Sequence, residues 1–286
     1  MPSQSPNEFV LSSSVRTEIV CRAAERTVST SALLSGINAS DSAVYDALST
    51  LRNRGLLTEA SGGWELTAHG QVVADSVSAW QQSEAFLATD PEFWKTHRLT
   101  VIPASFRRRL PAISEYEIVR DTPHNPNRSE DLAISILESA DSCELTTPYY
   151  SRRHQEAIPT HPETRLLVTR QAIDVSLQRY KSGLREELTA LELTNIRLTD
   201  CQFASVVTDD TLKFELPTLG EESMNHHAER STAEPSDQGS VTDTSAIFVS
   251  KMDAAVEFGR DLFDALWADS DPLGPYIKRQ FPELRE

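Results

Sequence analysis

The stretch Ser40–Arg54, SDSAVYDALSTLRNR, is followed at once by Gly55, and it predicts a helix that ends at a glycine. Serine is a preferred N-cap residue, and a glycine just past the last turn commonly terminates a helix. Residues at i, i+4 and i+7 form a narrow apolar stripe, which consists of Val44, Leu48 and Leu51. The other faces carry hydrogen-bonding side chains. By itself the segment fits a DNA-recognition helix and an ordinary amphipathic helix equally well, so the flanking chain has to decide.

The flanking chain predicts two more helices and a hairpin. Apolar residues at a period of 3.6 indicate a helix over 13–24, and a second, short helix is expected over Thr30–Gly36, only three residues before Ser40. After Gly55, two apolar runs surround Ser61-Gly62-Gly63, as in a β-hairpin. Thr67 then caps a longer helix, with Val73, Val77 and Trp80 as its apolar positions.

Two helices joined by a short turn, followed by a hairpin, form a winged helix-turn-helix in which the second helix enters the major groove of DNA. The glycines of the hairpin tip would let backbone N–H groups approach a phosphate. The predicted DNA contacts are therefore Ser40, Ser42, Tyr45, Ser49, Arg52 and Asn53 in the helix, with Gly62 and Gly63 at the tip.

The composition is strongly acidic. The 286 residues carry a formal net charge of −16, and only five of the 27 basic residues are lysines. In molar salt the Debye length is about 3 Å, so neighbouring carboxylates repel one another little, while arginine keeps its bidentate pairing. We therefore hypothesise a haloarchaeal, salt-adapted protein.

This hypothesis predicts that the melting temperature rises with KCl concentration, because salt screens the excess carboxylates. Calorimetry or circular dichroism between about 0.1 M and molar KCl measures the effect. Full stability at the low end would contradict salt adaptation.

Other function classes find little support. No stretch approaches the roughly 18 apolar residues of a membrane span, and no signal peptide is evident, so a cytoplasmic protein without membrane contact is predicted. Cys21, Cys143 and Cys201 are far apart and fit neither a disulfide framework nor a zinc site. No metal site and no cofactor are expected.

From Tyr116 onward the periodicity alternates between strand and helix, which predicts an α/β domain with a mixed sheet. Within it, Asn127–Glu130 is expected to form a capping box, and Ser176–Leu191 a helix. The sequence thus indicates a DNA-binding domain with a long connecting helix over 1–89 and an α/β sensor or dimerisation domain over 90–286. A mobile insertion containing His226-His227 is expected over 220–245.

The phrase SAVYDALSTLRNRGLLTEASGGWELTAHG carries a family resemblance. Residues 13–80 resemble an archaeal winged helix-turn-helix. The phrases FWKTHRLTVIPASFRRRL and FGRDLFDALWADSDPL make the rest similar to haloarchaeal regulators that carry a methanogenesis and filamentation regulator-type middle domain, in a TrmB-like layout. That layout resembles a single phospholipase D-type half domain. It implies a transcriptional regulator that binds double-stranded DNA as a homodimer.

Phospholipase D-type catalysis needs a His-x-Lys pair, and no histidine of this chain is followed two positions later by lysine. No enzyme activity is therefore expected. Ligands of parallel α/β sheets bind beyond the carboxyl ends of the strands. By that rule a small-molecule effector would meet Thr147, Tyr149, Tyr150 and Arg170, which could equally be ordinary loop and packing residues.

One alternative from another class stays open. Residues 1–75 contain five arginines and eight acidic residues, a balance of −3, whereas most DNA-binding domains are basic. This charge balance is compatible with a winged-helix protein–protein adaptor that never contacts DNA. The basic triplet Arg107–Arg109 is interpreted either as a DNA-backbone contact or as a solvated helix face.

Overall fold

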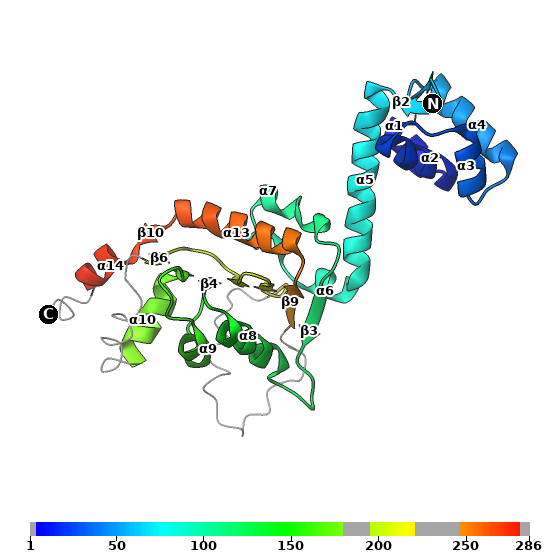
Figure 1. The fold of residues 1–286 in the computed structure, drawn as a ribbon. Helices are drawn as coiled ribbons and strands as arrows, with labels where there is room; N and C mark the ends of the chain where they lie inside the picture. The colour runs from blue at the N-terminus through cyan, green and yellow to red at the C-terminus, as the bar shows by residue number, and fades with distance from the viewer. Residues whose placement is uncertain (1–3, 180–194, 221–245, 281–286) are drawn as a thin grey trace. The chain divides into compact units, whose positions relative to one another are not determined.

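The computed structural model describes residues 4–179, 195–220 and 246–280. The chain divides into two compact units, Met1–Ala85 and Phe86–Glu286, each with its own core (Figure 1). The division lies within helix α5, Ala68–Thr89, slightly before the predicted boundary after residue 89. Phe86 explains this position, because its ring packs against Trp94 and Tyr116 of the second unit.

The N-terminal unit contains the predicted helices. They are α2 (Ser14–Glu25), α3 (Thr30–Gly36) and α4 (Asp41–Asn53), joined in sequence by short connections. A serine precedes each helix and accepts a hydrogen bond from a backbone N–H three residues later. Gly55 has a positive φ of 71°, as expected of a residue that ends a helix in the left-handed conformation.

A short helix at the start of this unit was not predicted. Helix α1 (Pro6–Leu11) begins with a capping box formed by Ser5 and Glu8, and it buries Phe9 in the core. The Arg54 guanidinium lies 3.8 Å from the centre of the Phe9 ring.

The predicted apolar stripe of α5 is only partly buried. Val73 and Val77 are buried as expected, but the prediction was wrong at Trp80, which is 49% exposed.

The predicted hairpin consists of β1 (Leu57–Ala60) and β2 (Gly63–Leu66), with Ala60 opposite Gly63. Val28, in the connection between α2 and α3, pairs with Trp64 through two backbone hydrogen bonds of 2.8 and 2.9 Å. This bridge pairs the outer edge of β2 with the connection between α2 and α3, so it holds the hairpin against the helices. The sequence did not predict it.

The described part of the second unit is built on an eight-stranded mixed sheet, which confirms the predicted mixed sheet. The order is β10-β6-β5-β4-β7-β8-β9-β3, and among these described strands only β4, β5 and β6 pair in parallel. The strands are β3 (Glu117–Arg120), β4 (Glu144–Thr147), β5 (Arg165–Val168), β6 (Ile196–Leu198), β7 (Ala204–Val207), β8 (Leu212–Glu215), β9 (Ala246–Ser250) and β10 (Asp271–Pro272).

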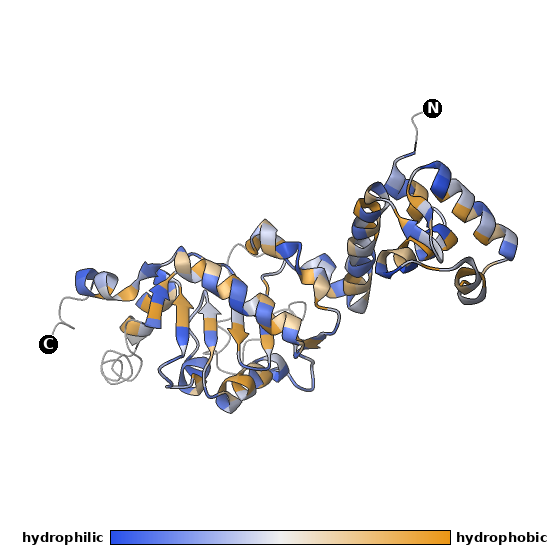
Figure 2. Cartoon of the chain, turned by 45° about the horizontal axis from the view of Figure 1, so that its top comes forward, coloured by the Kyte–Doolittle hydropathy of each residue, from blue (hydrophilic) through white to orange (hydrophobic). Residues whose placement is uncertain are grey.

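Helices cover both faces of this sheet (Figure 1). One layer contains α8 (Arg128–Ser139), α9 (Arg152–Ala157) and α10 (Arg170–Arg179). The amphipathic α13 (Asp253–Ala268), whose hydrophilic and hydrophobic residues form stripes in Figure 2, packs on the other face against β7 and β8. The described residues of this unit also form α6 (Pro91–Thr96), α7 (Ala104–Arg107), α14 (Leu273–Gln280) and two short 3-10 helices, Leu99–Val101 and Leu110–Ala112.

Two local predictions differ from the structure. The capping box at Asn127–Glu130 was wrong, because the Asn127 side chain makes no cap hydrogen bond; the N–H and hydroxyl of Ser129 donate instead to Asp121, at 2.8 and 2.7 Å. Helix α10 begins at Arg170 rather than at Ser176. The predicted remainder of that helix after residue 179, and the insertion at 221–245 with His226-His227, lie outside the described residues.

Within residues 4–179, 195–220 and 246–280, no helix is both long and apolar enough to cross a membrane.

Candidate functional sites

Helix α4 presents a polar face to solvent. Val44, Leu48 and Leu51 are buried, as the stripe predicted. On the opposite side the structure brings together, all exposed, the predicted residues Ser42, Tyr45, Ser49, Arg52 and Asn53. Tyr45 is 55% exposed, which is unusual for a large side chain with no ring partner in the described parts of the chain. This face is therefore open to a partner.

Ser40 caps α4, as its sequence position predicts. Its hydroxyl accepts the Ala43 backbone N–H at 3.3 Å and lies 3.1 Å from the Ser42 hydroxyl. Ser40 is thus occupied in starting the helix. A mutation there would act first on the helix N-terminus and only indirectly on any bound partner.

Arg52 is held by an acidic residue of the hairpin. Its Nη1 donates to the Glu59 carboxylate of β1 at 2.8 Å, and the two side chains are 51% and 65% exposed. Ion pairs this exposed contribute only about 0–1 kcal/mol, so the guanidinium can exchange Glu59 for another acceptor at small cost.

The two glycines of the hairpin are not equivalent. Gly62 is exposed at the turn, with open space around it and a φ of 102°. A Cβ at Gly63 would lie 2.1 Å from the Val28 carbonyl oxygen. Gly63 is half-buried at the start of β2 and is needed for close packing against Val28, whereas Gly62 is exposed at the turn. Contact of either glycine with DNA stays a prediction.

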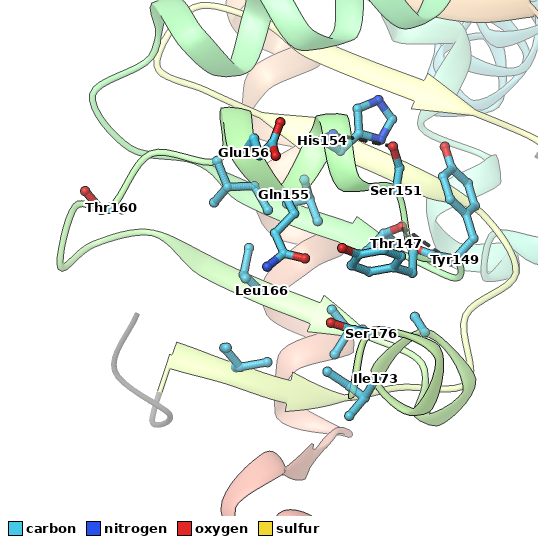
Figure 3. A pocket seen from close by; sticks show the side chains of 16 residues that line it. Thr147, Tyr149, Ser151, His154, Gln155, Glu156, Thr160, Leu166, Ile173 and Ser176 are labelled. Atoms are coloured by element: carbon cyan, nitrogen blue, oxygen red, sulfur yellow. Dashed lines mark hydrogen bonds between the residues drawn. The ribbon is translucent and has the colours of Figure 1, made fainter. Parts of the chain in front are cut away.

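A cavity of about 310 Å³ lies in the second unit, against β4, β5 and β6 and beneath α9 and α10 (Figure 3). Three of the four predicted effector residues line it, namely Thr147, Tyr149 and Tyr150. Arg170 does not, because its guanidinium, at the start of α10, pairs with Asp200 at 3.2 Å and Asp271 at 2.8 Å.

A buried charged cluster lies next to this cavity, and the sequence did not indicate it. Lys213 Nζ donates to Glu215 at 2.9 Å, and the Tyr149 hydroxyl donates to the same carboxylate oxygen at 2.8 Å. The Lys213 and Glu215 side chains are only 2% and 8% exposed. Burial, with the Glu215 charge beside it, raises the pKa of Tyr149 well above its usual value.

The sequence signal at this strand was misleading. Alternation of Leu212, Lys213, Phe214 and Glu215 is typical of a strand with one wet face, yet all four residues are buried. In the folded chain helices cover both faces of β8: Leu212 and Phe214 pack in one core cluster with residues of α13, and Lys213 lines a small cavity with Leu137 of α8 and His154 of α9.

His154 of α9 contacts the same region. Burial, together with the nearby Lys213 charge, lowers the pKa of His154 to about 4, so its ring is neutral at pH 7. Its Nε2 and the Thr146 hydroxyl are buried and lack a hydrogen-bond partner among the described residues.

The basic triplet behaves partly as a solvated face. Arg109 donates to Asp261 of α13 at 2.6 Å, and both side chains are more than two-fifths exposed.

In the described parts of the chain, no group of three or more His, Cys, Asp or Glu residues is arranged to hold a metal ion.

Comparison with known families gives one match to the N-terminal unit. Residues 5–85 match the HVO_A0261 N-terminal domain. The matched residues span α1 to α4, the hairpin and most of α5. A search of curated proteins finds no relative of the chain.

Solved structures give distant likenesses only. The archaeal chromatin protein TrmBL2, described as showing a novel mode of DNA binding, is 14% identical with a TM-score of 0.35; the match covers 90% of this chain and 93% of that one. The phospholipase D family member Nuc from Salmonella typhimurium is 12% identical (TM-score 0.33), covering 55% and 97%. NucT from Helicobacter pylori is 6% identical (TM-score 0.34), covering 55% and 98%. TM-scores this low support no functional conclusion.

Proposed function

We propose that the chain is a sequence-specific DNA-binding transcriptional regulator whose N-terminal unit is a winged helix-turn-helix. The observation that carries the proposal is the exposed polar face of α4, which follows α3 after a short turn and precedes the hairpin. In this arrangement α4 enters the major groove and the hairpin tip at Gly62 contacts the backbone. Ser42, Tyr45, Ser49, Arg52 and Asn53 would then contact bases and phosphates.

The charge of the unit requires that specific contacts supply most of the affinity. Asp41 and Asp46 of α4 are exposed, so DNA phosphates are not attracted over the whole helix face. Release of condensed counterions also contributes little in concentrated salt. Hydrogen bonds and apolar contacts to base edges depend less on bulk salt, and Tyr45 and Arg52 can supply them.

The proposal includes a homodimer and assigns no catalysis. Val72 and Trp80 of α5 are 66% and 49% exposed, an apolar surface that a second copy could cover. A two-fold dimer would match a palindromic operator. Phospholipase D-type chemistry needs a His-x-Lys pair, and no histidine in the sequence begins one. We therefore assign the second unit to dimerisation or effector sensing rather than to this chemistry.

A winged-helix adaptor that contacts only protein is the second candidate, favoured by the −3 balance of residues 1–75. Binding-site selection from a random duplex library, with the full chain in molar KCl, separates the two. A regulator enriches an inverted repeat whose half-sites are about 10 bp apart or a multiple of that distance, whereas an adaptor enriches no sequence. Light scattering in the same buffer tests the dimer, and a monomer mass would contradict it.

A further inference from the structure

The cavity beneath α9 and α10 has an apolar floor. Leu145, Leu166, Val168 and Ile196 cover its base from the three parallel strands, and Ile173 forms part of its wall. Its volume of about 310 Å³ is at the small end of the range for ligand pockets, roughly 300–1,000 Å³. A cavity of about 150 Å³ holds one benzene ring, so this one has room for a two-ring molecule.

Polar groups reach the cavity from opposite sides. Figure 3 shows Gln155 extending from α9 toward Leu166 of β5, and Ser176 on α10 across from it. An amide and a hydroxyl can each donate and accept a hydrogen bond, so together they suit one hydroxyl or carbonyl group on an otherwise apolar ligand.

The described lining of the cavity carries no lysine or arginine side chain that could pair with an anion. His154 is neutral at pH 7, and Lys213, in the adjacent cluster, pairs with Glu215. Glu156 at the rim pairs with Arg152 at 2.7 Å. A carboxylate or phosphate would therefore lose its hydration here without gaining a cationic partner.

From this geometry we infer that the cavity binds a neutral, two-ring aromatic or alicyclic molecule that carries one hydroxyl or carbonyl group. The ring system lies over Leu166, Val168 and Ile196, and the polar group bonds Gln155 and Ser176. This inference deepens the sensing role proposed above. It rests on that proposal only for its consequence at DNA, since binding itself needs the second unit alone.

Calorimetric titration of the full chain with 2-naphthol and with 2-naphthoate tests the inference. The two probes share their rings and differ in charge at pH 7. We expect one equivalent of 2-naphthol to bind saturably, and 2-naphthoate to bind at least about tenfold more weakly. The assay contains no DNA, so a failure of the DNA-binding proposal leaves its outcome unchanged.

Matched variants locate the binding site. Ile173→Trp puts an indole into the cavity and is expected to weaken 2-naphthol binding about tenfold or more. Ile134→Trp, a partly buried position of α8 that does not line the cavity, is the control and should bind as the wild type does. If Ile173→Trp melts early, Thr160→Trp, at an exposed lining position, blocks the mouth without disturbing the core. Absence of 2-naphthol binding, equal affinity for both probes, or undiminished binding in the cavity variant would each overturn the inference.

Discussion

Glu215→Met is expected to lower the free energy of unfolding by about 3–5 kcal/mol. The substitution removes the carboxylate that Lys213 Nζ contacts at 2.9 Å, and the ammonium, 2% exposed, then stays buried without its counter-charge. The Tyr149 hydroxyl loses its acceptor at 2.8 Å in the same step. Chemical denaturation followed by circular dichroism, at a KCl concentration where the wild type is stable, measures the loss.

Two further variants separate burial from ion pairing. Asp261→Met removes a carboxylate from the exposed pair with Arg109 and should change stability by no more than about 1 kcal/mol. The double variant Lys213→Met, Glu215→Met replaces both charges by apolar groups and should recover part of the loss. A single variant as stable as the wild type would mean that the cluster is not buried in solution.

Tyr45→Ala and Arg52→Ala are each expected to weaken binding to a selected operator by about 1–3 kcal/mol, which is roughly 5- to 150-fold. Both side chains lie on the exposed face of α4, away from the buried Val44 and Leu48, so neither substitution should change folding stability much. Gel shifts or fluorescence anisotropy in molar KCl, beside a melting curve for each variant, give the result.

The Arg52–Glu59 pair supplies a control of opposite sign. Glu59→Gln removes the carboxylate that holds the guanidinium and an acidic charge near DNA, so it should strengthen binding. Arg279→Ala removes the same charge as Arg52→Ala, from an exposed position of the other unit, and should leave affinity unchanged. Unaltered affinity in both Tyr45→Ala and Arg52→Ala would show that DNA does not bind at this face of α4.

Local signals predicted much of the secondary structure. Serine caps, terminal glycines and apolar periodicity predicted the positions of α2, α3 and α4, and the Gly62-Gly63 turn predicted the β1–β2 hairpin. These signals act over a few residues, so they are visible in the chain. The carboxyl-end rule for parallel strands also selected Thr147, Tyr149 and Tyr150, which line the cavity.

Long-range packing decided what the sequence could not. Position 63 needs a glycine because the Val28 backbone, 35 residues earlier in the chain, leaves no room for a Cβ. No local sequence pattern predicts that contact. Arg170 does not line the cavity, because its guanidinium pairs with Asp200 and Asp271, which the fold brings near it.

The sequence by itself determined the helix α4 that begins at Ser40, because a cap, an apolar stripe and a terminating glycine act within one segment. It also determined the alternation that builds a mixed sheet. Only the tertiary structure decided the sites. It paired Arg170 with Asp271, brought the Tyr149 hydroxyl to Glu215 in the core, and formed the cavity lined by α9 and α10. The physical reason is that charge pairing and burial depend on neighbours from distant parts of the chain, whereas caps and periodicity do not.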